Sequence, residues 1–222
     1  MSSSLFQIGL ATAAATLENQ DCAAFFEFPT GLWLIIADGA GGLSGGKQAA
    51  ELLIQIVTET LASETEIFSE QLAAILKEAD NRLFVHPRAG ETTAVLINLH
   101  NNRINGASVG DSGAFLLQTQ PEMEIIELTA QQQRKPLLGS GIAQPISFGN
   151  IPFTGTLLLA TDGLIKYSKI KNSYKIVFNN EVPLGAHLLV ESVRYASGNL
   201  PDDVTVIVCR KGQPSIGSNC RN

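Results

Sequence analysis

Several aspartates in this chain stand where apolar segments begin or end. Asp38 ends GLWLIIAD, Asp162 ends TGTLLLATD, Asp111 lies in GDSG, Asp202 opens DDVT and Asp21 precedes CAAFFEF. Taken singly, an aspartate before glycine is an ordinary turn pair. Taken together, aspartates at the ends of core strands can converge at one edge of a sheet. There they repel one another unless cations neutralise them.

The chemistry of such a cluster would be that of hard divalent cations. Oxygen-only ligands suit Mg²⁺ or Mn²⁺ better than zinc. Two such ions about 3.5 to 4 Å apart can activate a bound water and hold a phosphate ester for in-line attack. The three cysteines show no CxxC spacing and the three histidines lie outside these segments. Neither a zinc site nor a disulfide framework is therefore indicated.

Two amphipathic helices are predicted after the first strong strand signal. The continuous apolar run at 31–38 is typical of a buried strand. Apolar residues recur at helical spacing over 47–62 and again over about 68–83. These segments would form a helix pair that covers a sheet.

The pattern changes to strands from Thr92 onward. The segments TTAVLINL, RINGASVG and GAFLLQT are separated by the turn-forming NN and GDSG, and strands are also predicted at 154–162 and 203–210. Short helices are expected between 163 and 198. The order of strands with inserted helix pairs predicts an α+β fold with helices packed on sheets.

Composition limits the class of protein and its partners. Of the 222 residues, 45% are hydrophobic and 16% are charged, which excludes a disordered or coiled-coil chain. The net charge of −6 argues against nucleic acid or an anionic membrane as the main partner. No apolar run reaches the roughly 18 residues that span a bilayer. We expect a cytoplasmic monomer with one domain over residues 1–211 and a flexible tail over 212–222.

Six short motifs carry a resemblance to a known family. In this order and spacing they resemble the metal-dependent type 2C (PPM) Ser/Thr protein phosphatases over about residues 5–211. They are NQD (19–21), ADGAGG (37–42), ETTAV (91–95), SVGDSGAFLL (108–117), LLLATDGL (157–164) and PDDVTVIV (201–208). The resemblance implies a four-layer α-β-β-α sandwich of two antiparallel sheets flanked by helix pairs. It also implies a centre of two Mn²⁺ or Mg²⁺ ions at one end.

The resemblance also assigns roles to individual residues. Asp38 would bridge both ions, the backbone carbonyl of Gly39 would hold one, and Asp21, Asp162 and Asp202 would complete the metal-binding, catalytic set. This constellation implies hydrolysis of phosphoserine or phosphothreonine in a protein substrate by a water that bridges the ions.

Four further residues have other places in this scheme. Asp111 would support a weaker third ion, with a hairpin turn as the alternative. Asn19, Thr161 and Asp203 are interpreted as supporting or turn residues rather than ligands.

The chain departs from the family pattern at the substrate side. Thr16 stands where relatives carry a phosphate-binding arginine, Ala40 where eukaryotic relatives carry a histidine, and Gly113 where GDSR has its arginine. A hydroxyl cannot replace a bidentate guanidinium. The segment between 128–129 and 134–141 is very short, so the flap is reduced and we expect an open catalytic face.

Two alternatives follow from these departures and from one other motif. The missing arginine and the reduced flap motivate a weakly active or non-catalytic phosphoprotein-binding regulator. Arg88 or Arg134 could replace the lost phosphate contact, although solvated side chains are the simpler interpretation. The segment GGLSGGKQ (41–48) approaches a phosphate-binding loop, but Gln48 replaces the hydroxyl that binds magnesium, and nucleotide hydrolysis is disfavoured.

Overall fold

The computed structural model describes residues 5–28, 31–40, 45–62, 69–119 and 122–212. The predicted flexible tail lies outside the described residues from 213 onward, as do positions 41–44 of the glycine-rich segment. No helix in these ranges is long and apolar enough to cross a membrane.

The described strands form two sheets, and every paired strand is antiparallel. One sheet has the order β1-β11-β10-β7-β8, with bounds Phe6–Ala13, Val204–Lys211, Thr156–Ala160, Gly113–Gln118 and Glu124–Glu127. The other has the order β2-β3-β5-β6-β9, with bounds Asp21–Phe28, Gly31–Ala40, Ala94–His100, Arg103–Val109 and Ile146–Pro152. The short strand β4 (Glu91–Thr92) pairs with the end of β3.

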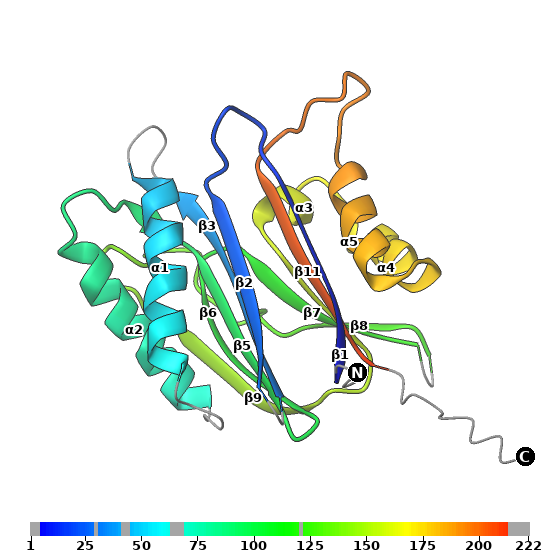
Figure 1. Cartoon of the computed structure of the whole chain (residues 1–222), viewed down its shortest axis with the longest axis horizontal. Coiled ribbons are helices and arrows are strands. Elements are labelled where there is room, and N and C mark those ends of the chain that lie inside the picture. Colours follow the sequence, from blue (N-terminus) through cyan, green and yellow to red (C-terminus); the bar gives the residue numbers. More distant parts are fainter. Residues whose placement is uncertain (1–4, 29–30, 41–44, 63–68, 120–121, 213–222) are drawn as a thin grey trace, which may run out of the picture.

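Helices cover the outer face of each sheet, as Figure 1 shows. The pair α1 (Gly46–Leu61) and α2 (Ser69–Phe84) packs on the sheet that contains β3, and α4 (Ile170–Asn179) and α5 (Val182–Glu191) pack on the sheet that contains β11. The short helix α3 (Asp162–Ile165) follows β10. The predicted four-layer α-β-β-α sandwich is therefore confirmed.

Burial on both faces explains the uninterrupted apolar run of β3. Trp33 and Ile35 belong to the cluster under α1 and α2, whereas Leu34 and Ile36 belong to the cluster between the two sheets. Successive side chains of a strand point to opposite faces, so a strand inside a four-layer sandwich needs apolar residues at every position. This strand carries Asp38 near its end, on a rigid support.

The turn that contains Asp111 joins the two sheets. It connects β6 of one sheet to β7 of the other. The hairpin alternative for this aspartate is therefore wrong, because a hairpin pairs the strands that it connects. The GDSG segment instead crosses the sandwich at one end.

The phosphate-binding-loop alternative is also wrong. Strand β3, which precedes the glycine-rich segment and α1, pairs with β5 in an antiparallel register. A strand-loop-helix unit that binds nucleotides in this way continues into a parallel strand. The described strands contain no parallel pair.

Candidate metal centre

Strand ends bring the five predicted metal-ligating aspartates to one end of the sandwich. Asp21 lies directly opposite Asp38 in the β2–β3 register. Asp162 follows β10 and Asp202 precedes β11, and these two strands are neighbours. The charge of Asp38 interacts with those of Asp21, Asp162, Asp111 and Asp202. The structure thus gathers every aspartate for which a ligand role is predicted.

The backbone around Asp38 is fixed by two threonines and a close approach of α1. The Asp38 N–H donates to Thr93 Oγ1 over 3.0 Å, and its carbonyl accepts from the Thr93 N–H and from Thr92 Oγ1 over 2.9 and 3.0 Å. A Cβ on Gly39 would collide with the backbone of Gly46 at the start of α1. Only glycine therefore fits beside Asp38.

Asp21 is held at one of its two carboxylate oxygens. Thr161 Oγ1 donates to Asp21 Oδ2 over 2.8 Å and accepts from the Thr205 N–H over 2.9 Å, and the Asp21 N–H donates to Asn19 Oδ1 over 2.9 Å. Asp21 Oδ1 is buried and has no hydrogen-bond partner among the described residues. A buried carboxylate oxygen without a partner is unfavourable, and a bound cation would satisfy it.

Asp203 anchors the loop between β1 and β2. Its Oδ1 and Oδ2 accept from the N–H groups of Ala15 and Gln20, each over 2.7 Å. A Cβ on Gly163 would collide with the Asp203 carbonyl, which ties the start of α3 to the same point. Both carboxylate oxygens of Asp203 are thus used by the backbone, in agreement with a supporting role.

Burial and mutual repulsion raise the pKa values of these carboxyls. The pKa of Asp38 rises to about 8, because of burial first and then the charges of Asp21 and Asp162. Burial raises the pKa of Asp21 to about 7, against the side chains of Thr161 and Thr205, which lower it, and with smaller contributions from Asp203 and Asp162. The pKa of Asp202 is also raised, mainly by burial and by Asp162. The fold therefore gathers more negative charge than it stabilises by itself near neutral pH.

A small cleft of about 220 Å³ opens beside Asp38. Thr16 lies on its rim with an exposed side chain, and its hydroxyl donates to the Glu18 carbonyl over 3.1 Å. The lining residues are Ala15, Thr16, Gln20, Asp38, Gly39, Pro201, Asp202 and Asp203. Neither Arg88 nor Arg134 is among them, so in this arrangement neither replaces the missing arginine.

The short segment after β8 packs against the crossing that contains Asp111. The Gly110 N–H donates to the Gln133 carbonyl over 2.9 Å, and Gln132 Nε2 donates to the Ser112 carbonyl over 2.6 Å. The reduced flap therefore supports the crossing from one side. That the face is more open than in relatives remains a prediction.

The sequence analysis assigned no role to three residues that shape this site. Thr93 Oγ1 and Ser112 Oγ lie 2.7 Å apart, which links the Asp38 strand to the β6–β7 crossing. The Lys166 ammonium forms an ion pair with Asp162 Oδ2. The four-residue spacing of this pair on a helix was the available signal for Lys166.

The donor set fits hard divalent cations, but the side chains are not closed around an ion. All the candidate ligands offer oxygen, and Asp21 Oδ1 has no partner. Within the described ranges, no group of three or more His, Cys, Asp or Glu side chains is arranged to hold a metal as it stands. Ion binding would therefore require the carboxylates to move together.

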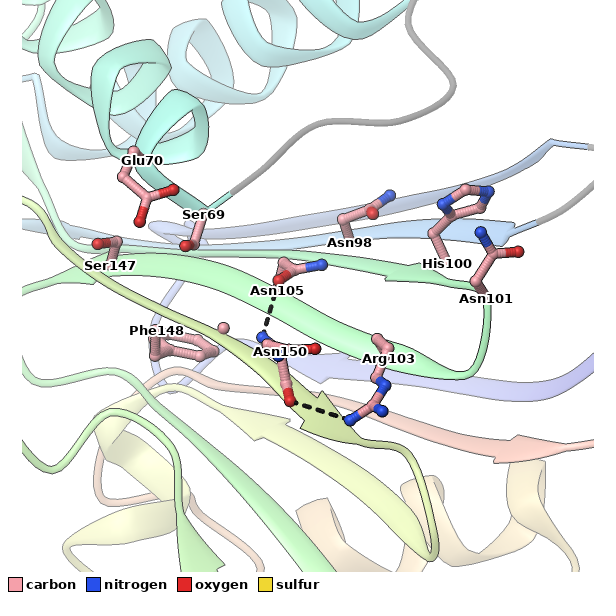
Figure 2. A pocket seen from close by; sticks show the side chains of 11 residues that line it. Ser69, Glu70, Asn98, His100, Asn101, Arg103, Asn105, Ser147, Phe148 and Asn150 are labelled. Carbon is pink, nitrogen blue, oxygen red and sulfur yellow. Dashed lines mark hydrogen bonds between the residues drawn. The ribbon is translucent and has the colours of Figure 1, made fainter.

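A second cavity, of about 600 Å³, lies away from the aspartates, beside the start of α2. Figure 2 shows Asn98 and Asn105 on neighbouring strands at this cavity. Asn105 Oδ1 accepts from the Asn150 N–H over 2.9 Å. Asn98 has no exposed surface, and within the part of the chain that the structure describes neither its Oδ1 nor its Nδ2 has a hydrogen-bond partner. Because the amide is not exposed, we assign this cavity no catalytic role.

Replacing Asn98 with leucine should stabilise the protein. The change removes two buried polar atoms without partners, which is worth about 1–2 kcal/mol, or an increase of roughly 2–8 °C in Tm. Thermal unfolding followed by circular dichroism measures the effect. The matched change Asn105→Leu should lower Tm, since it leaves the Asn150 N–H without its acceptor. A lower Tm for Asn98→Leu would show that the amide has a partner in solution.

The sandwich with strand-end aspartates at one end defines a class of protein. A family model described as protein phosphatase 2C matches residues 8–136. The chain therefore belongs to the protein phosphatase 2C family, a PPM phosphatase family. No curated protein matches the sequence.

Solved bacterial phosphatases share the fold at low sequence identity. The serine/threonine phosphatase PstP from Mycobacterium tuberculosis has a TM-score of 0.78 and 20% identity, covering 94% of this chain and 99% of that one. The catalytic domain of PstP in complex with two manganese ions has a TM-score of 0.77 and 21% identity, covering 94% and 99%. Stp1 from Staphylococcus aureus has a TM-score of 0.75 and 18% identity, covering 95% and 97%.

Proposed function

We propose that this protein is a metal-dependent phosphatase that hydrolyses phosphoserine and phosphothreonine in proteins. The observation that carries the proposal is the gathering of half-buried, mutually repelling aspartates around Asp38, one of which has a carboxylate oxygen with no partner among the described residues. Such a cluster is unfavourable without cations. Membership of the family and the two-manganese complex of PstP support the same interpretation.

Each residue of the site would have a separate role in the proposed reaction. Asp38, Asp21, Asp162 and Asp202 and the Gly39 carbonyl would hold two ions, with Asp111 beside a weaker third. When bound, Mn²⁺ or Mg²⁺ ions supply a nucleophilic water at neutral pH and offset the charge that develops on the phosphate. Thr161 orients Asp21 through the 2.8 Å hydrogen bond, and Thr92 of β4 and the following Thr93 fix the backbone of Asp38.

The shape of the site favours a phosphate on a protein side chain. The cleft beside Asp38 is small and opens at the surface, where Thr16 is exposed. A phosphate on a short, solvent-facing side chain can reach such a cleft while the rest of the substrate stays outside. We therefore propose a phosphorylated protein as the partner.

Phosphate release tests the proposal directly. The wild-type protein should hydrolyse p-nitrophenyl phosphate and a phosphothreonine peptide with Mn²⁺ or Mg²⁺, and EDTA should abolish the turnover. Turnover that persists in EDTA would contradict the two-ion proposal. No turnover with bound Mn²⁺ would favour the second candidate, a phosphoprotein-binding regulator, for which the observation is the neutral Thr16 on the rim of the cleft.

Replacing Thr16 with arginine should lower the KM for the phosphopeptide. A guanidinium at this rim can donate two hydrogen bonds to a phosphate, and bonds to charged groups are worth about 1.5–3 kcal/mol, so KM should fall roughly tenfold or more. Steady-state kinetics with Mn²⁺ at saturation measures the change.

The adjacent Leu17 offers a matched control. It is fully exposed and does not line the cleft, so Leu17→Arg adds the same charge at the wrong place. Its KM should stay close to that of the wild type. An equal fall in KM for both variants would mean that net charge, rather than a positioned guanidinium, limits substrate binding.

A further inference from the structure

Helix α3 places a lysine beside the metal centre. Asp162 is the first residue of the helix, and Lys166 follows one turn later as its C-cap. The Lys166 N–H donates to the Asp162 carbonyl over 2.7 Å, and its ammonium forms an ion pair with Asp162 Oδ2. Backbone and side chain thus both connect Lys166 to a carboxylate that is predicted to bind metal.

The ammonium acts on more than one carboxylate of the cluster. Its charge also interacts with Asp111 and Asp202. The Lys166 side chain is 46% exposed whereas that of Asp162 is 13% exposed, so the lysine reaches the cluster from the solvent side. It can therefore leave the cluster without disturbing the core.

We infer that Lys166 is a tethered cation that competes with a divalent ion for Asp162 and so weakens the affinity of the centre for metal. The inference rests on the proposed metal-dependent function and adds a determinant of metal affinity to it. Its basis is the ion pair at a candidate ligand together with the two further aspartates that the same ammonium faces.

The chemistry of lysine suits this role. An ammonium is a compact charge on a flexible four-carbon stem, with three donors and no acceptor. The Lys166 ammonium can neutralise carboxylates in the metal-free protein. Sharing a carboxylate oxygen with a divalent ion, however, costs free energy. Metal binding must therefore break the ion pair with Asp162, and the energy of that pair is subtracted from the binding energy.

The lysine also accounts for the open arrangement of the ligands. No group of three candidate ligands in the described part of the chain is closed around one point. The Lys166 ammonium forms an ion pair with Asp162. This carboxylate is therefore held away from the arrangement that an ion would require. Removal of this charge should let the carboxylates respond to a metal alone.

Calorimetric titration of metal-free protein with Mn²⁺ at one fixed pH tests the inference. Lys166→Gln keeps a polar side chain of similar length without the charge and should bind Mn²⁺ about tenfold more tightly, because a unit charge near the cluster is removed. Lys166→Arg retains the charge and should bind like the wild type. Lys169→Gln removes a nearby exposed charge that forms no ion pair within the described residues, and its affinity should be unchanged.

Thermal unfolding in EDTA and in Mn²⁺ provides a readout that does not depend on activity. Lys166→Gln should have a lower Tm than the wild type in EDTA, since the aspartates lose their counter-charge, and a larger increase in Tm with Mn²⁺. Equal Mn²⁺ affinity for Lys166→Gln and Lys169→Gln would overturn the inference while leaving the metal centre intact. Absence of Mn²⁺ binding by all four proteins would overturn the metal centre itself, and the inference with it.

Discussion

Replacing Asp38 with asparagine should lower metal-dependent phosphate release about 1,000-fold or more. The charge of Asp38 interacts with those of the other four aspartates, so Asp38 is well placed to bridge two ions. Without correctly held ions, the transition state loses several kcal/mol of charge stabilisation, which raises the activation free energy by the same amount. Each increase of about 1.4 kcal/mol lowers the rate tenfold. Release of phosphate from the phosphothreonine peptide with Mn²⁺ measures the loss.

Stability in EDTA separates this loss from misfolding. A raised pKa means that folding of the metal-free protein near neutral pH must protonate Asp38, which costs stability, so Asp38→Asn should unfold at a higher temperature than the wild type in EDTA. An inactive but more stable variant identifies a functional carboxylate. Retained activity would remove Asp38 from the catalytic set.

A second aspartate supplies the comparison. Asp111→Asn should reduce activity less than Asp38→Asn, because Asp111 is expected beside the weaker third ion only. Equal losses would place Asp111 among the principal ligands.

The strong elements of the fold could be predicted because their signals are local. The apolar run of β3, the helical spacing of α1 and α2 and the alternating valines and isoleucines of β11 each follow from burial against a neighbouring layer. Element bounds differed from prediction by only a few residues. The convergence of the aspartates was also predictable, because each one stands at the end of such an element.

Four strands, β1, β2, β8 and β9, were not predicted, and for β1 and β9 there is a physical reason. Strand β1 (FQIGLATA) lies at a sheet edge with mostly half-buried or exposed side chains, and β9 (ISFGNIP) carries a glycine and ends in a proline. Glycine and proline are tolerated at edges but weaken the local signal. These strands form through pairing with β11 and β6, which lie far away in the sequence.

The parts of the site that depend on three-dimensional packing could not be predicted from the sequence either. A hairpin turn was one of the two interpretations of Asp111, because a GDSG turn has the same local chemistry in a hairpin as between sheets. The contact between Thr93 and Ser112 joins segments 19 residues apart. Only the positions of the two sheets determine that these hydroxyls meet.

Metal-free protein should become less stable as the pH rises from about 5 to about 8. The pKa of Asp38 rises to about 8 and that of Asp21 to about 7, from an ordinary value of 3.8, chiefly through burial. Between the unfolded and folded pKa values, the folded protein binds more protons than the unfolded chain. Stability therefore falls with pH across this window. A loss of only about 2 kcal/mol would lower Tm by roughly 4–8 °C.

Tm in EDTA at a series of pH values measures this dependence. Mn²⁺ should raise Tm most at pH 8, since it binds the ionised carboxylates, and Asp38→Asn should flatten the profile. Asp80 cannot produce the same trend. Burial alone would raise its pKa, but hydrogen bonds from Lys77 and three backbone N–H groups outweigh burial and lower it. Its contribution is lost only as the pH falls below about 4.

A flat wild-type profile between pH 5 and pH 8 would contradict the electrostatic account of the cluster. It would mean that the carboxylates are already neutralised in the metal-free protein. Lys166 is the cation placed to do this, through its ion pair with Asp162. In that case Lys166→Gln should restore the fall of Tm with pH. The slope therefore reports how much of the negative charge the protein balances by itself and how much it leaves for divalent ions.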